Sequence, residues 1–212
     1  MRKINQFGET VEGYTIPVLN EREIRAAAGI LFFFTFLSLM LILLKGNFLM
    51  IKYVITVFMT DFIIRVFINP KFAPTLILSR LIVSRQNPEY VGAAQKKFAW
   101  IIGVVLSATM FVLMVLVNSY SPITGIICLF CLTFLFFESV FGICLGCLFY
   151  NMFYKEKAQH CPGEICEIKD KHEIQKVTFY QILVVLAIAA MVVLLAFLCN
   201  DFFSIKPHPL FG

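Results

Sequence analysis

Charged side chains are scarce in this sequence of 212 residues: aspartate, glutamate, lysine and arginine together make up 15%, whereas hydrophobic residues make up 60%. An ordinary soluble domain carries about 25% charged residues, so the composition excludes a typical soluble protein. The sequence also lacks a phosphate-binding glycine loop, a serine-nucleophile motif and a c-type haem motif. These absences remove common signals of nucleotide, acyl-transfer and cytochrome chemistry.

The short alternating segments of a membrane β-barrel are also missing, and long apolar runs stand in their place. A helix needs roughly 20 apolar residues to cross the hydrocarbon core. The sequence therefore predicts an all-α integral membrane protein with five transmembrane helices, of which the fourth is long enough to tilt, protrude or break. The five runs are Ala26 to Leu44, Phe48 to Ile68, Phe98 to Val117, Ile123 to Phe153 and Phe179 to Cys199.

Proline marks the end of the second run, because Pro70 and Pro74 disfavour helix at and just before their own positions. The segment Thr75 to Arg85 is too short to span, so we expect a short interfacial helix there. The predicted organisation is a cytoplasmic N-terminal tail, a four-helix membrane core, a cytoplasmic loop bearing cysteines, and a C-terminal transmembrane helix with a short outer tail. Their ranges are 1–25, 26–154, 155–177 and 178–212.

Positive charge is distributed unevenly between the predicted connections. Four lysines and arginines lie in the N-terminal segment, six between the second and third runs and five between the fourth and fifth, against three on the opposite side. The positive-inside rule then predicts a multi-pass protein of the cytoplasmic (inner) membrane, with its N-terminus inside and its C-terminus outside. The N-terminal segment has no cleavable signal pattern. Basic residues spread along membrane edges do not indicate nucleic-acid binding.

Three charged residues fall inside the apolar runs, where charge is costly and usually faces the bundle interior. Asp61 and Arg65 are four residues apart, so they share one helix face and can pair. Glu138 has no partner at helical spacing; Arg65 could pair with it, or it could be protonated. On an ideal helix Glu138 shares a stripe with Gly142 and Gly146, whose small size lets another helix approach.

Two cysteine pairs carry the chemistry that the sequence suggests. Cys144 and Cys147 have the CxxC spacing, and Cys161 and Cys166 follow in a polar loop, where core packing does not explain them. Such pairs suit a dithiol switch or half a metal site. A straight fourth helix would separate Cys144 and Cys147 from Glu138, whereas a bend at Gly142 or Gly146 would bring them together.

A third CxxC, formed by Cys128 and Cys131, is interpreted as small apolar packing. Both functional pairs fall on the predicted cytoplasmic side, where a permanent disulfide is not expected.

Five short motifs stand out along the sequence: Arg25-Ala-Ala-Ala-Gly29, Asp61-Phe-x-x-Arg65, Pro70/Pro74, Lys96-Lys97-Phe98-Ala99 and Glu138-x-x-x-Gly-x-Cys-x-Gly-Cys147. Together they resemble an uncharacterised bacterial membrane family, numbered 4395 among domains of unknown function. The resemblance covers about residues 20–154, and it implies four core helices and a gene setting with thioredoxin-like and rhodanese-like proteins. It implies no established activity. This sequence departs from the family pattern at Gln95, where proline is usual, and by the Cys161/Cys166 loop and the fifth run.

The favoured hypothesis is a membrane thiol or sulfur relay, which would act as a thiol-disulfide oxidoreductase. Cys144 and Cys147 would form the inner pair, Cys161 and Cys166 would meet a thioredoxin- or rhodanese-like partner, and Glu138 would move a proton. One alternative is a transporter of a small sulfur compound such as thiosulfate. Another is a structural zinc site made by the same four cysteines. The sequence requires no cofactor, although quinone or zinc is possible, and it leaves the oligomeric state open.

Overall fold

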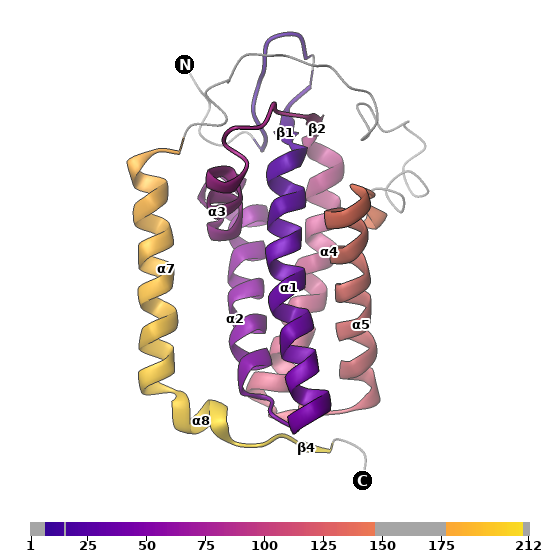
Figure 1. Ribbon diagram of the computed structural model, residues 1–212, viewed down its shortest axis with the longest axis vertical. Helices are drawn as coiled ribbons and strands as arrows, with labels where there is room; N and C mark the ends of the chain where they lie inside the picture. Colours follow the sequence, from indigo (N-terminus) through magenta and orange to yellow (C-terminus); the bar gives the residue numbers. More distant parts are fainter. Residues whose placement is uncertain (1–6, 15, 147–176, 210–212) are drawn as a thin grey trace.

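A computed structural model describes residues 7–14, 16–146 and 177–209. Seven α-helices are present among these residues, and the longest of them run side by side along one axis (Figure 1). The helices are α1 (Glu21–Lys45), α2 (Leu49–Ile63), α3 (Pro74–Ile82), α4 (Ala93–Phe111), α5 (Pro122–Phe136), α7 (Phe179–Leu198) and α8 (Asn200–Ser204). Short π-helical turns extend α2, α4 and α5 as η1 (Ile64–Ile68), η3 (Val112–Leu116) and η4 (Phe137–Phe141), and a 3-10 turn, η2 (Pro70–Phe72), precedes α3.

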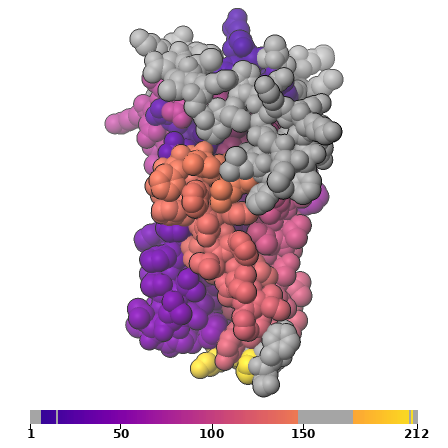
Figure 2. Space-filling view, turned by 90° about the vertical axis from the view of Figure 1, so that its right-hand side faces the viewer, coloured from indigo at the N-terminus to yellow at the C-terminus, as the bar shows by residue number. Residues whose placement is uncertain are grey.

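Four of these helical segments are long and apolar enough to cross a membrane. They are Glu21–Lys45, Ala93–Leu116, Pro122–Phe141 and Phe179–Leu198. The structure therefore has the candidate spans of a multi-pass membrane protein. Between the first two of them, α2 and η1 also run the length of the bundle (Figure 1). In the space-filling view α5 lies between α1 and α4 (Figure 2).

Local side chains determine where α1 and α5 begin. Asn20 precedes α1, and its side chain accepts the backbone N–H of Arg22, whereas Gly46 ends α1 in the left-handed conformation at φ 61°. Ser121 and Thr124 form a reciprocal capping box at the start of α5, with Pro122 in the first helical position. These polar signals end the apolar segments at the two ends of the bundle.

A small sheet covers one end of the bundle. Strand β1 (Val18–Asn20) pairs antiparallel with β2 (Tyr90–Gly92), which lies immediately before α4. Beneath it the side chain of Glu23, near the start of α1, forms a buried ion pair with Arg80 of α3 at 3.0 Å. The sheet and this pair hold the starts of α1 and α4 and the short helix α3 together.

The last long helix, α7, is joined to the rest of the chain mainly at its two ends. Near one end Gln181 Nε2 donates to the backbone oxygen of Lys71 at 2.8 Å. At the other end Lys52 Nζ donates to the backbone oxygens of Phe203 at 3.1 Å and Ile205 at 2.8 Å. Strands β3 (Ser119–Tyr120) and β4 (His208–Pro209) pair nearby.

The expected helix boundaries are confirmed for the second and fifth runs and need correction elsewhere. Helix α1 begins at Glu21 rather than at Ala26, because Asn20 caps it, and the three residues before it form strand β1. Helix α4 begins at Ala93, five residues before the predicted Phe98. The fourth run does not continue to Phe153 as one helix, because its regular helical structure ends at Phe141. A short helix is present near the expected place as α3, Pro74–Ile82, and its position at the membrane interface stays a prediction.

Candidate functional site

Gly142 ends the helical segment formed by α5 and η4, and the chain changes direction there. Its backbone adopts the left-handed conformation at φ 68°, which glycine tolerates and most residues do not. Arg25 Nη2 of α1 donates to the backbone oxygen of Val140 at 3.2 Å, which satisfies one of the carbonyls left free where the helix ends. The bend that the sequence allowed at Gly142 is therefore a full helix end, and residues 143–146 follow a new direction.

The redirected segment lies tightly against α4. A Cβ atom placed on Gly146 would lie 2.5 Å from the Cβ and 2.8 Å from the Cα of Ala99, which leaves no room for a side chain. Between the two glycines, the side chain of Cys144 is 4% exposed. The expected close approach at Gly146 is confirmed, whereas Gly142 acts by ending the helix rather than by admitting a neighbour.

A cavity of about 60 Å³ lies inside the bundle beside this segment. It brings together three of the predicted site residues, Cys144, Glu138 and Arg65, and Trp100 also lines it. The other lining residues are mostly apolar and come from α1, α2, α4 and α5. They include Ile24, Leu31, Phe58, Phe62, Gly103, Cys131 and Leu135. A few polar groups converging in an apolar cavity are typical of a binding or reaction site.

Lys96 links two carboxylates at the edge of this cavity. Its side chain is fully buried, its ammonium lies 2.8 Å from Glu21 Oε2, and it also forms a short ion pair with Glu138 Oε1. The Glu138 side chain is 15% exposed. The partner of Glu138 is thus Lys96, and the pairing with Arg65 suggested by the sequence is wrong, because Arg65 is bound elsewhere. Three charged groups from α1, α4 and η4 meet at this point.

Arg65 belongs to a second polar network, centred on Asp61. Arg65 Nε donates to Asp61 Oδ2 at 2.7 Å, and Nη2 donates to Thr75 Oγ1 at 2.6 Å. Its guanidinium lies 4.7 Å from the ring centroid of Phe62 and 5.1 Å from that of Trp100. Asp61 and Arg65 are at most 2% exposed, so the predicted pair is confirmed and faces protein.

Three predicted site residues, Cys147, Cys161 and Cys166, lie outside the described residues, so their roles stay predictions. Within residues 7–14, 16–146 and 177–209 no group of three or more histidine, cysteine, aspartate and glutamate side chains could hold a metal ion. The zinc alternative also needs those three cysteines, and it stays a prediction.

Sequence reasoning missed Lys96 and Glu21 as parts of the site. Glu21 falls in the predicted N-terminal tail, and Lys96 falls in the predicted connection before the third apolar run, so neither is expected inside the bundle. Their signal was the helical spacing between Lys96 and the apolar residues after it, such as Trp100 one turn later. Their convergence on Glu138 depends on packing between α1, α4 and η4, which spacing in one segment does not encode.

Comparison with known proteins gives one match. Residues 19–155 match the family described as "Domain of unknown function (DUF4395)". No match is found among curated proteins or among solved structures. The matched range contains the cavity residues, Gly142 and the Cys144/Cys147 pair, and it ends before the Cys161/Cys166 loop.

Proposed function

We propose that this chain, which belongs to the DUF4395 family, is a membrane thiol or sulfur relay in which Cys144 is the inner exchanging thiol. One observation carries the proposal: the turn at Gly142 brings Cys144 into the cavity that Glu138 lines. A cysteine on a straight continuation of the helix would point away from that carboxylate. The proposal concerns the reaction class, in which a sulfur–sulfur bond is exchanged.

The exchange step needs a thiolate, because the thiol itself is a poor nucleophile. In the proposed step the Cys144 thiol gives its proton to Glu138, and the thiolate attacks one sulfur of a disulfide or persulfide on the partner. A new sulfur–sulfur bond forms to Cys144 and the old bond breaks. From a disulfide, the partner's other sulfur departs as a thiolate and the partner stays joined to Cys144. From a persulfide, the outer sulfur moves to Cys144 and the partner leaves as a thiolate. No external oxidant is needed, because the partner's disulfide or persulfide is reduced as Cys144 is oxidised.

The pairing at Lys96 makes Glu138 a suitable proton acceptor. With Glu21 and Glu138 both ionised, the two carboxylates and one ammonium carry a net charge of −1. When Glu138 takes a proton the group becomes neutral, and Glu21 still pairs with Lys96. Protonation therefore strands no charge, which matters because an unpaired buried charge is costly.

The remaining cysteines have roles that rest on the sequence. Cys147 would resolve the intermediate by attacking the bond formed at Cys144, and Cys161 with Cys166 would pass the disulfide or sulfane sulfur to a thioredoxin-like or rhodanese-like protein. Such a partner would approach from the cytoplasm. The cavity supports this side, because its lining comes from the halves of the helices nearest the β1–β2 end.

The proposed topology has five spans, with the β1–β2 end in the cytoplasm. The passage formed by α2 and η1 carries Lys52, Asp61 and Arg65, yet these side chains are 1%, 0% and 2% exposed. Its charges are therefore covered by protein, and the passage can cross the hydrocarbon core as the others do. The excess of lysine and arginine at the connections on the β1–β2 side supports this orientation.

Trapping tests the relay with a thioredoxin variant that lacks its own resolving cysteine and whose remaining cysteine is activated as a mixed disulfide with thionitrobenzoate. Purified chain carrying Cys147→Ser, with Cys161 and Cys166 also replaced by serine, should displace thionitrobenzoate and accumulate a mixed disulfide with thioredoxin, because the second thiol that would release the partner is gone. Adding Cys144→Ser should abolish that species, and Cys199→Ser is the matched control that should leave it unchanged. Glu138→Gln should slow trapping by about 100-fold, the lower end of the usual effect of a general base.

Two outcomes would contradict the relay. One is a mixed disulfide that forms equally fast without Cys144. The other is about one zinc ion per chain, with the cysteines blocked from alkylation until a chelator is added, and this outcome would favour the structural zinc site.

Transport of a small sulfur compound is the second candidate, and one observation favours it. A further cavity of about 30 Å³ is lined by Phe58 and Cys131, which also line the first cavity. Two cavities in succession along a bundle are expected of a permeation path. Uptake of thiosulfate into vesicles that persists after Cys161→Ser and Cys166→Ser would support transport and oppose the relay.

A further inference from the structure

The second cavity lies at the centre of the four core helices and has a composition of its own. Its volume is about 30 Å³, and every wall residue comes from α1, α2, α4 or α5. The lining residues are Thr35, Val54, Ile55, Phe58, Ser107, Met110, Cys128 and Cys131. None of the described lining residues is a carboxylate, so the polar character of the cavity comes from two hydroxyls and three sulfur atoms.

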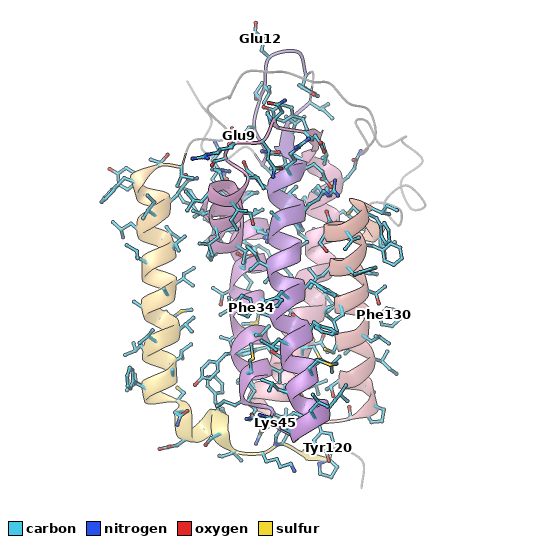
Figure 3. All side chains as sticks on the ribbon, in the orientation of Figure 1. Glu9, Glu12, Phe34, Lys45, Tyr120 and Phe130 are labelled. Atoms are coloured by element: carbon cyan, nitrogen blue, oxygen red, sulfur yellow. The ribbon has the colours of Figure 1, made fainter. Side chains whose placement is uncertain are left out.

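The three sulfur atoms belong to side chains of two helices, α4 and α5, that line the same cavity. Cys128 and Cys131 are three residues apart on α5, which places them on one face of that helix. Met110 is on α4, and it packs in the same buried cluster as Cys128. Cys128 and Met110 are 7% and 5% exposed, and no disulfide joins the cysteines. Sulfur atoms are visible among the side chains of the bundle in Figure 3.

Thr35 supplies an independent sign that this cavity takes an occupant. Its hydroxyl is buried and has no hydrogen-bond partner among the described residues, although the side chain lines the cavity. Comparable helical hydroxyls such as those of Thr56 and Thr133 donate to the carbonyl four residues earlier. A buried polar atom without a partner is costly, so the Thr35 hydroxyl is expected to meet a ligand or a water bound to one.

We propose that this cavity is a binding site for a soft monovalent cation, Cu⁺, held by Cys128, Cys131 and Met110. Thiolate and thioether ligands select Cu⁺ among the biological cations, whereas Mg²⁺, Ca²⁺ and Mn²⁺ need oxygen ligands that this cavity does not offer. A volume of about 30 Å³ suits a single ion with at most one water. Water alone would satisfy Thr35 but would not account for the three converging sulfur atoms.

The charge balance also favours a monovalent ion. Binding converts one cysteine thiol to a thiolate and releases one proton, so that Cu⁺ and one thiolate form a neutral unit inside the membrane. The second cysteine and Met110 complete the sulfur shell without adding charge. A divalent ion such as Zn²⁺ would leave a net positive charge, or would need both thiolates and a fourth ligand.

The test uses a chain in which Cys144, Cys147, Cys161 and Cys166 are replaced by serine, so that its outcome does not depend on the relay. This protein, purified in detergent without oxygen, is titrated with Cu⁺ against a chromogenic Cu⁺ chelator. The expected result is about one Cu⁺ per chain. Cys128→Ser and Cys131→Ser should each weaken binding by more than the 10–100-fold typical of a residue outside the ligand shell. Met110→Leu should weaken it less, and Cys199→Ser is the matched control that should leave it unchanged.

X-ray absorption of the copper-loaded four-serine chain gives a second measurement that does not depend on the folding of any variant at Cys128, Cys131 or Met110. A shell of two or three sulfur atoms is expected, and a shell of nitrogen or oxygen atoms alone would overturn the proposal. Failure of the four-serine chain to compete with the chelator for Cu⁺ would overturn the proposal. An unchanged affinity for Cu⁺ in the same chain with Cys128→Ser and Cys131→Ser would also overturn it.

Discussion

Asp61 of α2 caps the start of α3: its Oδ1 accepts the backbone N–H of Thr75 at 2.9 Å, and its Oδ2 accepts the Thr75 hydroxyl at 2.8 Å. The residue in the usual capping position of α3 is Ala73, whose side chain cannot accept a hydrogen bond. A carboxylate from another helix replaces it. The same carboxylate holds Arg65, so the short helix and the charge pair depend on one another.

Replacing Arg65 should therefore destabilise the fold strongly. We expect Arg65→Ala to lower the free energy of unfolding by about 3–5 kcal/mol, the usual cost of leaving one member of a buried ion pair alone. Arg65→Lys should cost less, because it keeps the charge but loses the donor to Thr75 and the contact with Trp100. Denaturant titration in mixed micelles measures both. The exposed Arg85 gives the control Arg85→Ala, which should change stability by less than about 0.5 kcal/mol.

The group around Lys96 predicts an asymmetry between its members. Glu138→Gln should change the free energy of unfolding by less than about 1 kcal/mol, because Glu21 still pairs with Lys96. Lys96→Met should cost about 3–5 kcal/mol, because it leaves two carboxylates without their cation. Adding Glu138→Gln to Lys96→Met should then recover part of the loss. Additive costs in this pair of variants would show that the two residues do not interact.

Contact between Gly146 and Ala99 can be tested by exchanging the two residue types. Gly146→Ala should destabilise the protein by about 1–3 kcal/mol, as overpacking usually does. Ala99→Gly in the same chain should restore part of that stability by reopening the space. Gly125 is the matched control, because a Cβ there meets nothing within 4 Å, and Gly125→Ala should stabilise α5 by up to about 1 kcal/mol.

The orientation in the membrane can be checked at the two ends that Figure 3 labels. Glu12 lies at the β1–β2 end, and Lys45 and Tyr120 lie at the opposite end. Single cysteines placed at Glu12 and at Lys45, in a chain whose own cysteines are serine, should differ in their reaction with an impermeant maleimide added to intact cells. Cysteine at position 45 should react and cysteine at position 12 should not. The reverse pattern would place the proposed partner outside the cytoplasm.

Much of the helical architecture could be predicted from the sequence, because apolar runs and proline positions act locally. The runs at Phe48–Ile68 and Phe179–Cys199 agree with α2 plus η1 and with α7 to within one residue at each end. The Asp61–Arg65 pair was also predictable, since its spacing is set within one helix. These features need no knowledge of which helices are neighbours.

The arrangement of the site was less predictable, because it depends on contacts between distant segments. Glu138 pairs with Lys96, which is 42 residues away in the sequence and on another helix. Residue spacing predicts pairs within one helix, but it does not predict a pair between two helices. The end of the helix at Gly142 was one of two possible bends, and glycine alone does not decide between them. The hydrogen bond from Arg25 to the Val140 carbonyl and the packing of Gly146 on Ala99 are tertiary contacts that accompany the bend at Gly142.

The way α7 is attached has a consequence for the response of the protein to its lipid surroundings. Gln181 holds one end of this helix and Lys52 holds the segment after the other end, while most of its apolar side chains between them lie on the surface. The apolar length between these two attachments is fixed by the protein. A bilayer thicker or thinner than that length would be accommodated by tilt, at a cost of a fraction of a kcal/mol for each ångström of mismatch. Tilting would strain the hydrogen bonds at both attachments. A change in bilayer thickness would therefore change the tilt of α7, and the strain would reach α2 through Lys52.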